Sequence, residues 1–146
     1  MENRKYKIII IDDNQAFINA MKFLFLKRND AEVIGEANDG VQFLKLIETV
    51  KPDLVLMDII LPGIDGIKLV RTAQEFGYNL KILGVTMSDD PTIHAQMNQS
   101  GFIGGILKSQ FFEDFDQALK KIENNETYFP ILIWNNNKEK RDESSY

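Results

Sequence analysis

Short apolar segments alternate along the chain with longer segments whose apolar residues recur every three or four positions. The short segments are rich in Ile, Val and Leu and lie at residues 6–11, 32–36, 54–57, 81–85 and 105–107. Because nearly every position in them is apolar, we expect strands that are buried on both faces. The longer segments, at residues 15–27, 41–50, 66–76, 91–100 and 111–122, have the spacing of amphipathic helices.

This alternation predicts an α/β fold built from five strand–helix repeats. Parallel strands that are joined by right-handed helical crossovers form one sheet with helices on both faces. The composition changes after Pro130, where a last apolar patch at residues 131–134 is followed by a polar and charged stretch. We therefore interpret residues 1–130 as one domain and residues 131–146 as a linker or tail.

Composition and charge narrow the class of protein. The 146 residues are 44% hydrophobic and 27% charged, as expected of one folded domain. The chain has no cysteine, which excludes thiol catalysis, disulfides and thiolate zinc sites and fits a reducing compartment. It has no apolar run long enough to span a membrane, so we expect a cytoplasmic protein with no membrane partner. A net charge of -5 opposes direct binding of nucleic acid.

Polar side chains follow four of the predicted strands. Asp12 and Asp13 follow the first strand, Asp58 the third, Thr86 the fourth and Lys108 the fifth. The functional crevice of an open α/β sheet lies at the carboxyl ends of its strands, so we expect these side chains at one edge. Neighbouring carboxylates repel one another, and Mg²⁺, which prefers oxygen ligands, relieves that repulsion. The carboxylates, a bound Mg²⁺, a lysine and a hydroxyl are together the groups needed for phosphoryl transfer to an aspartate.

The same residues carry a family resemblance. Four isoleucines precede Asp12 and Asp13, the block Pro-Asp-Leu-Val-Leu-Met-Asp spans residues 52–58, and Leu-Pro-Gly-Ile-Asp-Gly spans residues 61–66. With Thr86 and Lys108 in order behind them, these motifs resemble the receiver domain of two-component response regulators over about residues 5–129. The resemblance implies a flavodoxin-like, doubly wound parallel sheet of five strands in the order 2-1-3-4-5. Residues 101–129 look most like regulators that carry a C-terminal helix-turn-helix DNA-binding domain.

The resemblance also implies roles for individual residues. Asp58 would accept the phosphoryl group and help to bind Mg²⁺. Asp13 would bind the ion directly, Asp12 largely through water, and Ile60 through its backbone carbonyl.

The remaining implied roles concern the phosphoryl group and the partners. Thr86 would donate a hydrogen bond to one phosphoryl oxygen, and Lys108 would pair with another. The phosphoryl donor would be the phosphohistidine of a sensor histidine kinase, and phosphorylation would favour a homodimer. Such a protein is a signalling switch in transcription regulation, and we do not expect an enzyme.

Three positions depart from the family pattern. Gly105 stands three residues before the lysine, where family members often place an aromatic residue that swings inward on activation. Ser109 replaces the proline that often follows the lysine, and Met87 follows Thr86 where a small residue is usual. These departures leave open a pseudo-receiver that binds partners without phosphorylation. An Mg²⁺-dependent phosphatase on the same fold is a third hypothesis, although Ile60 stands where such an enzyme needs a second acid.

Several residues have simpler interpretations. Asp12 and Asp13 could cap the first helix, as could Asn14. His94 lies among polar residues and is expected at the surface. Trp134 could dock on the domain, contact a partner or continue into further chain. Phenylalanines at helical spacing are expected in the core, namely Phe23, Phe25, Phe43 and Phe76.

Overall fold

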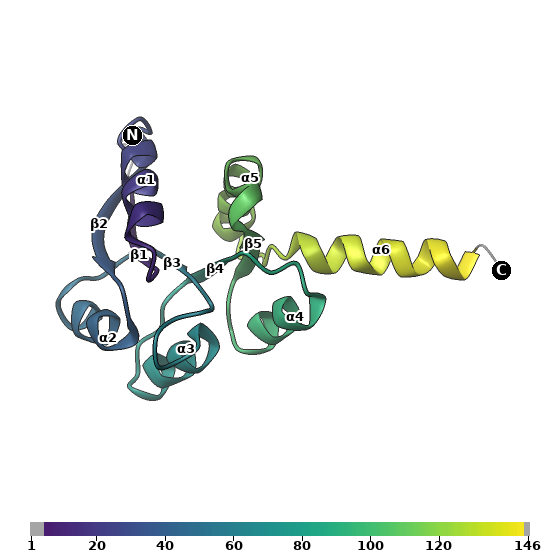
Figure 1. Ribbon diagram of the computed structural model, residues 1–146. Helices are drawn as coiled ribbons and strands as arrows, with labels where there is room; N and C mark the ends of the chain where they lie inside the picture. The colour runs from purple at the N-terminus through teal and green to yellow at the C-terminus, as the bar shows by residue number, and fades with distance from the viewer. Residues whose placement is uncertain (1–4, 145–146) are drawn as a thin grey trace. The chain divides into compact units, whose positions relative to one another are not determined.

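A computed structural model describes residues 5–144 (Figure 1). Its five parallel strands form one sheet in the order β2-β1-β3-β4-β5, which confirms the predicted doubly wound, flavodoxin-like fold. The elements in chain order are β1 (Tyr6–Ile11), α1 (Gln15–Phe25), β2 (Ala31–Ala37), α2 (Gly40–Thr49), β3 (Leu54–Met57), α3 (Gly66–Glu75), β4 (Ile82–Thr86), α4 (Pro91–Gln99), β5 (Gly104–Leu107), η1 (Lys108–Gln110), α5 (Phe111–Glu123) and α6 (Pro130–Ser144).

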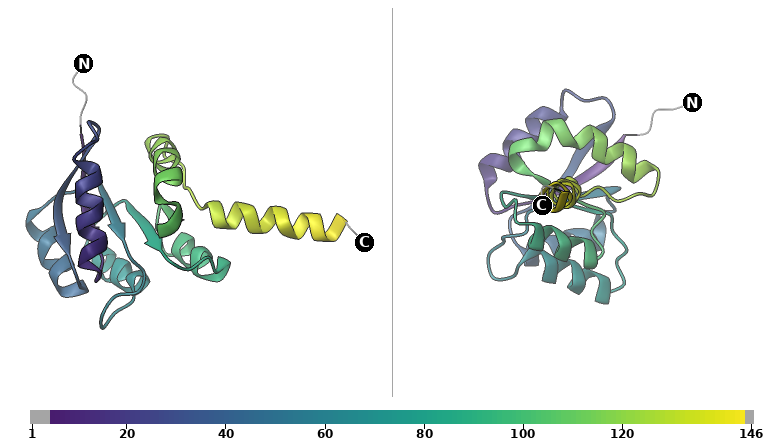
Figure 2. Two further views of the ribbon diagram at one scale, coloured as in Figure 1. Left: turned by 45° about the horizontal axis from the view of Figure 1, so that its top comes forward. Right: turned by 90° about the vertical axis from the view of Figure 1, so that its right-hand side faces the viewer.

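The chain divides within β4, between Leu83 and Gly84, into two compact units. In the first unit β1 lies between β2 and β3, with Ile8 opposite Leu54 and Ile11 opposite Met57. Helix α1 covers one face of these strands, and α2 and α3 cover the other (Figures 1 and 2). Because both faces are covered, the four isoleucines that end β1 are no more than 1% exposed.

Short polar side chains start the helices of the first unit. Asn14, Asp39 and Asp65 each accept a hydrogen bond from the backbone N–H three residues later, at 3.2, 2.8 and 2.8 Å. Each bond satisfies one of the N–H groups that the first helical turn leaves without a partner. The strand–helix turns at the carboxyl edge of the sheet are therefore fixed by local hydrogen bonds.

The second unit is built around β5. Helices α4 and α5 lie on opposite sides of this strand (Figure 1). Tyr128 pairs with Gly104 in a parallel bridge. Helix α6 begins beside β5, contacts α4 and β5, and extends away from both (Figure 2). The segment that we predicted to be a linker or tail is thus helical over most of its length.

Three burial predictions were wrong. His94 is completely buried, because its ring packs inside the second unit and bonds the backbone of the preceding loop. Phe23 is 59% exposed on the outer side of α1, where the Lys27 ammonium lies 4.7 Å from its ring centre. Phe76 is 68% exposed because it follows the last turn of α3. The other two phenylalanines are buried as predicted, namely Phe25 and Phe43.

Within residues 5–144, none of the helices has the length and apolar composition that crossing a membrane requires.

Candidate functional site

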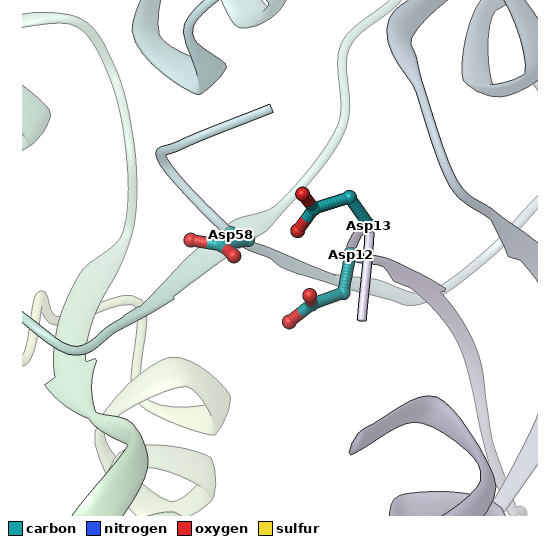
Figure 3. A group of neighbouring side chains, drawn as sticks. All are labelled: Asp12, Asp13 and Asp58. Atoms are coloured by element: carbon teal, nitrogen blue, oxygen red, sulfur yellow. The ribbon is translucent and has the colours of Figure 1, made fainter. Parts of the chain in front are cut away.

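Three carboxylates meet at the carboxyl edge of the first unit. Asp12 and Asp13 follow β1, Asp58 follows β3, and each offers an oxygen that lies within 4.8 Å of the other two (Figure 3). The two strands are neighbours in register, so the residues after them emerge side by side. Asp12 is 1% exposed and Asp58 is 8% exposed, whereas Asp13 faces solvent. The predicted clustering of these acids is what the structure shows.

The backbone of both buried acids is tied into the sheet. The Asp12 N–H donates to the carbonyl of Ala37 at 3.0 Å, and the Asp58 N–H donates to the carbonyl of Ile11 at 2.9 Å. These bonds continue the ladders of β1 with β2 and of β3 with β1 by one residue. The cluster is therefore held on rigid backbone rather than on mobile loops.

Backbone N–H groups also orient the two buried carboxylates. Oδ1 of Asp12 accepts from the Asn14 N–H at 2.8 Å, and Oδ1 of Asp58 accepts from the Ile60 N–H at 3.2 Å. Both are bonds to the residue two positions later, as in an Asx-turn. The cap of α1 is Asn14, so helix capping does not account for Asp13.

The loop that follows Asp58 folds back against it. The Gly66 N–H donates to the carbonyl of Ile59 at 2.6 Å. A Cβ atom at Gly66 would lie 2.6 Å from the carbonyl oxygen of Asp58 and 3.0 Å from Cα of Ile59. Gly63, at the tip of the loop, has a φ of 76°, a conformation that glycine adopts without strain. Both glycines of the loop are thus required by the backbone near Asp58.

A network of polar side chains braces the other side of the cluster. Nδ2 of Asn38 donates to the backbone carbonyl of Asp12 at 3.2 Å and to Oε1 of Gln15 at 3.0 Å. Gln15 and Lys22 in turn each donate to Glu36 at 2.7 Å. The amide of Gln15 and the ammonium of Lys22 hold the pKa of the Glu36 carboxyl below its usual range. Asn38 was not predicted as a site residue, although its place directly after a strand is the same signal that identified the acids.

The cluster has the chemistry of a divalent-cation site. Two unit charges 4 Å apart repel by about 4 kcal/mol at an effective dielectric constant of 20, so three close carboxylates oppose the folded state. A hard cation with oxygen ligands removes this repulsion, and Mg²⁺ sites typically use one or two carboxylates with water and phosphate. Such oxygens are supplied, just after the ends of β1 and β3, by Asp12, Asp13 and Asp58 (Figure 3). The residues present therefore fit a magnesium ion.

The other predicted site residues also lie at strand ends. Thr86 is the last residue of β4, is 1% exposed, and accepts the Ser88 N–H at 3.2 Å through its hydroxyl. Lys108 is half-buried at the start of η1, directly after β5. The side chain of Ile60 is 71% exposed, and that of Met87 is 83% exposed. The roles of these residues remain predictions.

The family model for the response regulator receiver domain matches residues 8–120 of this chain. The chain belongs to this family. The DNA-binding transcriptional activator EvgA of Escherichia coli K12 is 31% identical over 125 residues, covering 86% of this chain and 61% of EvgA. The transcriptional regulatory protein DegU of Brevibacillus brevis is 28% identical over 136 residues, covering 93% and 58%. The chain thus spans about three fifths of either relative.

Solved structures agree with the receiver fold. A LuxR-family two-component response regulator from Aurantimonas has a TM-score of 0.83 at 25% identity, with 93% of this chain and 98% of that chain covered. The non-phosphorylated receiver domain of the stress response regulator RcsB from E. coli gives 0.79 at 22% identity, with 87% and 99% covered. The receiver resemblance that the motifs predicted is therefore confirmed, and EvgA and DegU are named as transcription regulators.

Proposed function

We propose that this receiver accepts a phosphoryl group on Asp58 from the phosphohistidine of a sensor histidine kinase. The observation that supports this most is the cluster of Asp12, Asp13 and Asp58, whose oxygens lie within 4.8 Å of one another in a member of the receiver family. Asp12, Asp13 and Asp58 would hold Mg²⁺, together with the backbone carbonyl of Ile60. The bound ion would neutralise charge on the carboxylates and on the incoming phosphoryl group.

The chemical step is a displacement at phosphorus. A carboxylate oxygen of Asp58 forms the new P–O bond while the P–N bond of the phosphohistidine breaks and the imidazole of the kinase leaves. The bond from the Ile60 N–H to Oδ1 keeps the Asp58 carboxylate in one orientation for this attack. In this proposal the Thr86 hydroxyl donates to one phosphoryl oxygen and Lys108 pairs with another.

We further propose that the chain is the cytoplasmic regulatory part of a transcription regulator and that phosphorylation favours a homodimer. The names of the relatives, a DNA-binding transcriptional activator and a transcriptional regulatory protein, support this output.

Intact mass spectrometry after incubation with Mg²⁺ and acetyl phosphate tests the phosphorylation. We expect the wild type to gain one phosphoryl group and Asp58→Asn to gain none. Asp53→Asn is a matched control, because Asp53 stands just before β3 whereas Asp58 stands just after it. Failure of the wild type to gain mass would favour the phosphorylation-independent module, and continuous consumption of acetyl phosphate would favour the phosphatase. A gain that persists in Asp58→Asn would place the phosphoryl group elsewhere.

Ile60→Asn is expected to shorten the lifetime of phosphorylated Asp58. The Ile60 side chain stands two residues after Asp58 and is 71% exposed, but it is apolar and cannot orient an attacking water. One added hydrogen bond of about 1 kcal/mol to that water would speed hydrolysis by about fivefold. The measurement is the decay of the phosphorylated mass after removal of the donor. Ile60→Val is the control, and an equal or longer lifetime in Ile60→Asn would contradict the argument.

This chain is expected not to bind duplex DNA by itself. Its net charge of -5 opposes the phosphate backbone, since non-specific affinity comes from lysines and arginines that neutralise phosphates. On α5 the basic residues Lys120 and Lys121 share the helix with several acids, and Lys121 is paired with Glu126 at 3.1 Å. A gel-shift titration at low salt is the measurement. A salt-sensitive shift at micromolar protein would show that the charge distribution supports binding after all.

A further inference from the structure

The space beside Gly105 is filled by side chains from elsewhere in the second unit. A Cβ atom at this buried residue of β5 would lie 2.7 Å from Cε of Met97, 3.1 Å from Nδ1 of His94 and 3.2 Å from Cδ1 of Phe129. Phe129 itself is 5% exposed and follows α5 by several residues. An aromatic ring therefore packs beside this position of β5, but it comes from the segment that leads into α6.

Hydrogen bonds fix that segment along β5. The Gly105 N–H donates to the carbonyl of Tyr128 at 3.0 Å, and the Tyr128 N–H donates to the carbonyl of Ile103 at 2.9 Å. The Tyr128 hydroxyl donates to Asp114 on α5 at 2.9 Å. Burial and this hydrogen bond raise the pKa of Tyr128 to about 12, so the hydroxyl keeps its proton near neutral pH. We refer to residues 127–129 as the latch.

The latch also forms the base of α6. The carbonyl of Phe129 accepts from the N–H groups of Leu132 at 3.1 Å and of Ile133 at 3.4 Å, so the first turn of the helix is built on this residue. The helix begins at Pro130 and contacts α4 and β5 near its start (Figure 2). Any displacement of the Phe129 backbone must therefore move α6.

His94 connects the latch with the loop between β4 and α4. Its Nε2 lies 2.8 Å from the carbonyl oxygen of Ser88. A carbonyl only accepts, so Nε2 donates this hydrogen bond, and in the tautomer that carries its proton on Nε2 the other nitrogen, Nδ1, is an acceptor. This Nδ1 is buried and has no hydrogen-bond partner among the described residues. A buried acceptor without a partner destabilises the docked arrangement, and departure of Phe129 would open it to water.

We propose that the latch is a two-state device in which Phe129 docks against Gly105 and His94 transmits changes of the β4–α4 loop to α6. The connection is continuous in the second unit: the Thr86 hydroxyl accepts the Ser88 N–H, the Ser88 carbonyl bonds His94, and His94 and Phe129 border the same point beside Gly105. Control of the latch by phosphorylation rests on the proposed function, in which Thr86 contacts the phosphoryl group.

Amide hydrogen exchange of the full chain, followed by NMR, tests the docking. In Gly105→Phe we expect the backbone amides of residue 105 and of Tyr128 to exchange about tenfold faster than in the wild type. Amides in the middle of α5 should keep their wild-type protection. Gly105→Ala is the graded control. Its Cβ meets first the terminal methyl of Met97, which can move aside, so we expect a change of less than about threefold. Wild-type protection of Tyr128 in Gly105→Phe would overturn the proposal.

A second pair of variants keeps the test decisive if Gly105→Phe does not fold. Phe129→Ala removes the docked ring, and we expect faster exchange at Tyr128 with α5 unchanged. In the double variant Gly105→Phe/Phe129→Ala the ring enters the same space from β5. We expect the double variant to have a higher Tm than Gly105→Phe, while the Tyr128 amide still exchanges faster than in the wild type. Unchanged exchange at Tyr128 in Phe129→Ala would overturn the proposal.

The transmission step is tested with the phosphorylated protein. In the wild type we expect phosphorylation by acetyl phosphate to change the hydrogen-exchange rate of the Tyr128 amide. In His94→Leu we expect phosphorylation to leave that rate unchanged. If mass spectrometry shows a phosphoryl group on Asp58 and Tyr128 exchange does not change, the transmission through His94 is wrong while the proposed function stands. If Asp58 takes up no phosphoryl group, the proposed function fails, and the Gly105 and Phe129 variants still decide whether the latch exists.

Discussion

Gly66→Ala is expected to lower the free energy of unfolding by about 1–3 kcal/mol and to weaken binding of Mg²⁺. The added Cβ would lie 2.6 Å from the carbonyl oxygen of Asp58 and 3.0 Å from Cα of Ile59. Both contacts are with backbone, which cannot rotate away as a flexible side chain does, so the loop or the end of β3 must shift. Such a shift moves Asp58 relative to its two acidic neighbours. Urea unfolding and a calorimetric Mg²⁺ titration measure the two effects.

Gly63→Ala is the matched control in the same loop. Gly63 has a φ of 76°, and no described heavy atom lies within 4 Å of the place of its Cβ. An alanine there costs about 1–2 kcal/mol of backbone strain but meets no neighbour. The two variants are thus expected to be destabilised by similar amounts, with Mg²⁺ affinity reduced in Gly66→Ala alone. Equal Mg²⁺ affinity in both would show that the contact with Asp58 does not position the site.

Mg²⁺ is expected to stabilise the wild type and to have no effect on Asp13→Ala. A ligand that binds only the folded chain stabilises it by about 1.4 kcal/mol when its concentration is about ten times its Kd. For a chain of this size, that corresponds to a Tm increase of roughly 4 °C. Without the ion, Asp13→Ala should melt above the wild type, because it removes one of three mutually repelling carboxylates. Thermal melts with EDTA and with saturating Mg²⁺ provide both comparisons.

Glu48→Ala is the control for the change in net charge. Glu48 is an exposed acid of α2 outside the cluster, so its removal should leave the Mg²⁺-dependent increase intact. A wild type that melts at the same temperature in EDTA and in Mg²⁺ would mean that the three acids form no metal site.

The strands and the acid cluster could be predicted because their signals are local. β3 and residues 8–11 of β1 are buried on both faces, so these positions are all apolar, and the bounds of both strands were predicted to the residue. The register of neighbouring parallel strands then brings the residues after Ile11 and Met57 together. This rule required only the strand ends and the strand order, which the family resemblance implied.

The second unit was harder to predict because its packing depends on contacts between distant residues. His94 is buried because its ring packs beside Gly105 of β5, which helical spacing around polar neighbours does not reveal. The sequence showed that Gly105 lacks an aromatic side chain, but nothing in it indicates that Phe129 supplies a ring at that place. Helix α6 was missed because its residues after Trp134 are polar on every side and carry no apolar periodicity.

In the proposed two-state latch, helix α6 would act as a lever arm on the second unit. Its 15 residues make a rod about 22 Å long at 1.5 Å per residue. A rotation of about 20° about Pro130 would carry the far end of this rod by roughly 8 Å, whereas the ring of Phe129 at its base would move by much less. A small repacking beside β5 would therefore become, at the far end of α6, a displacement comparable to the width of a helix.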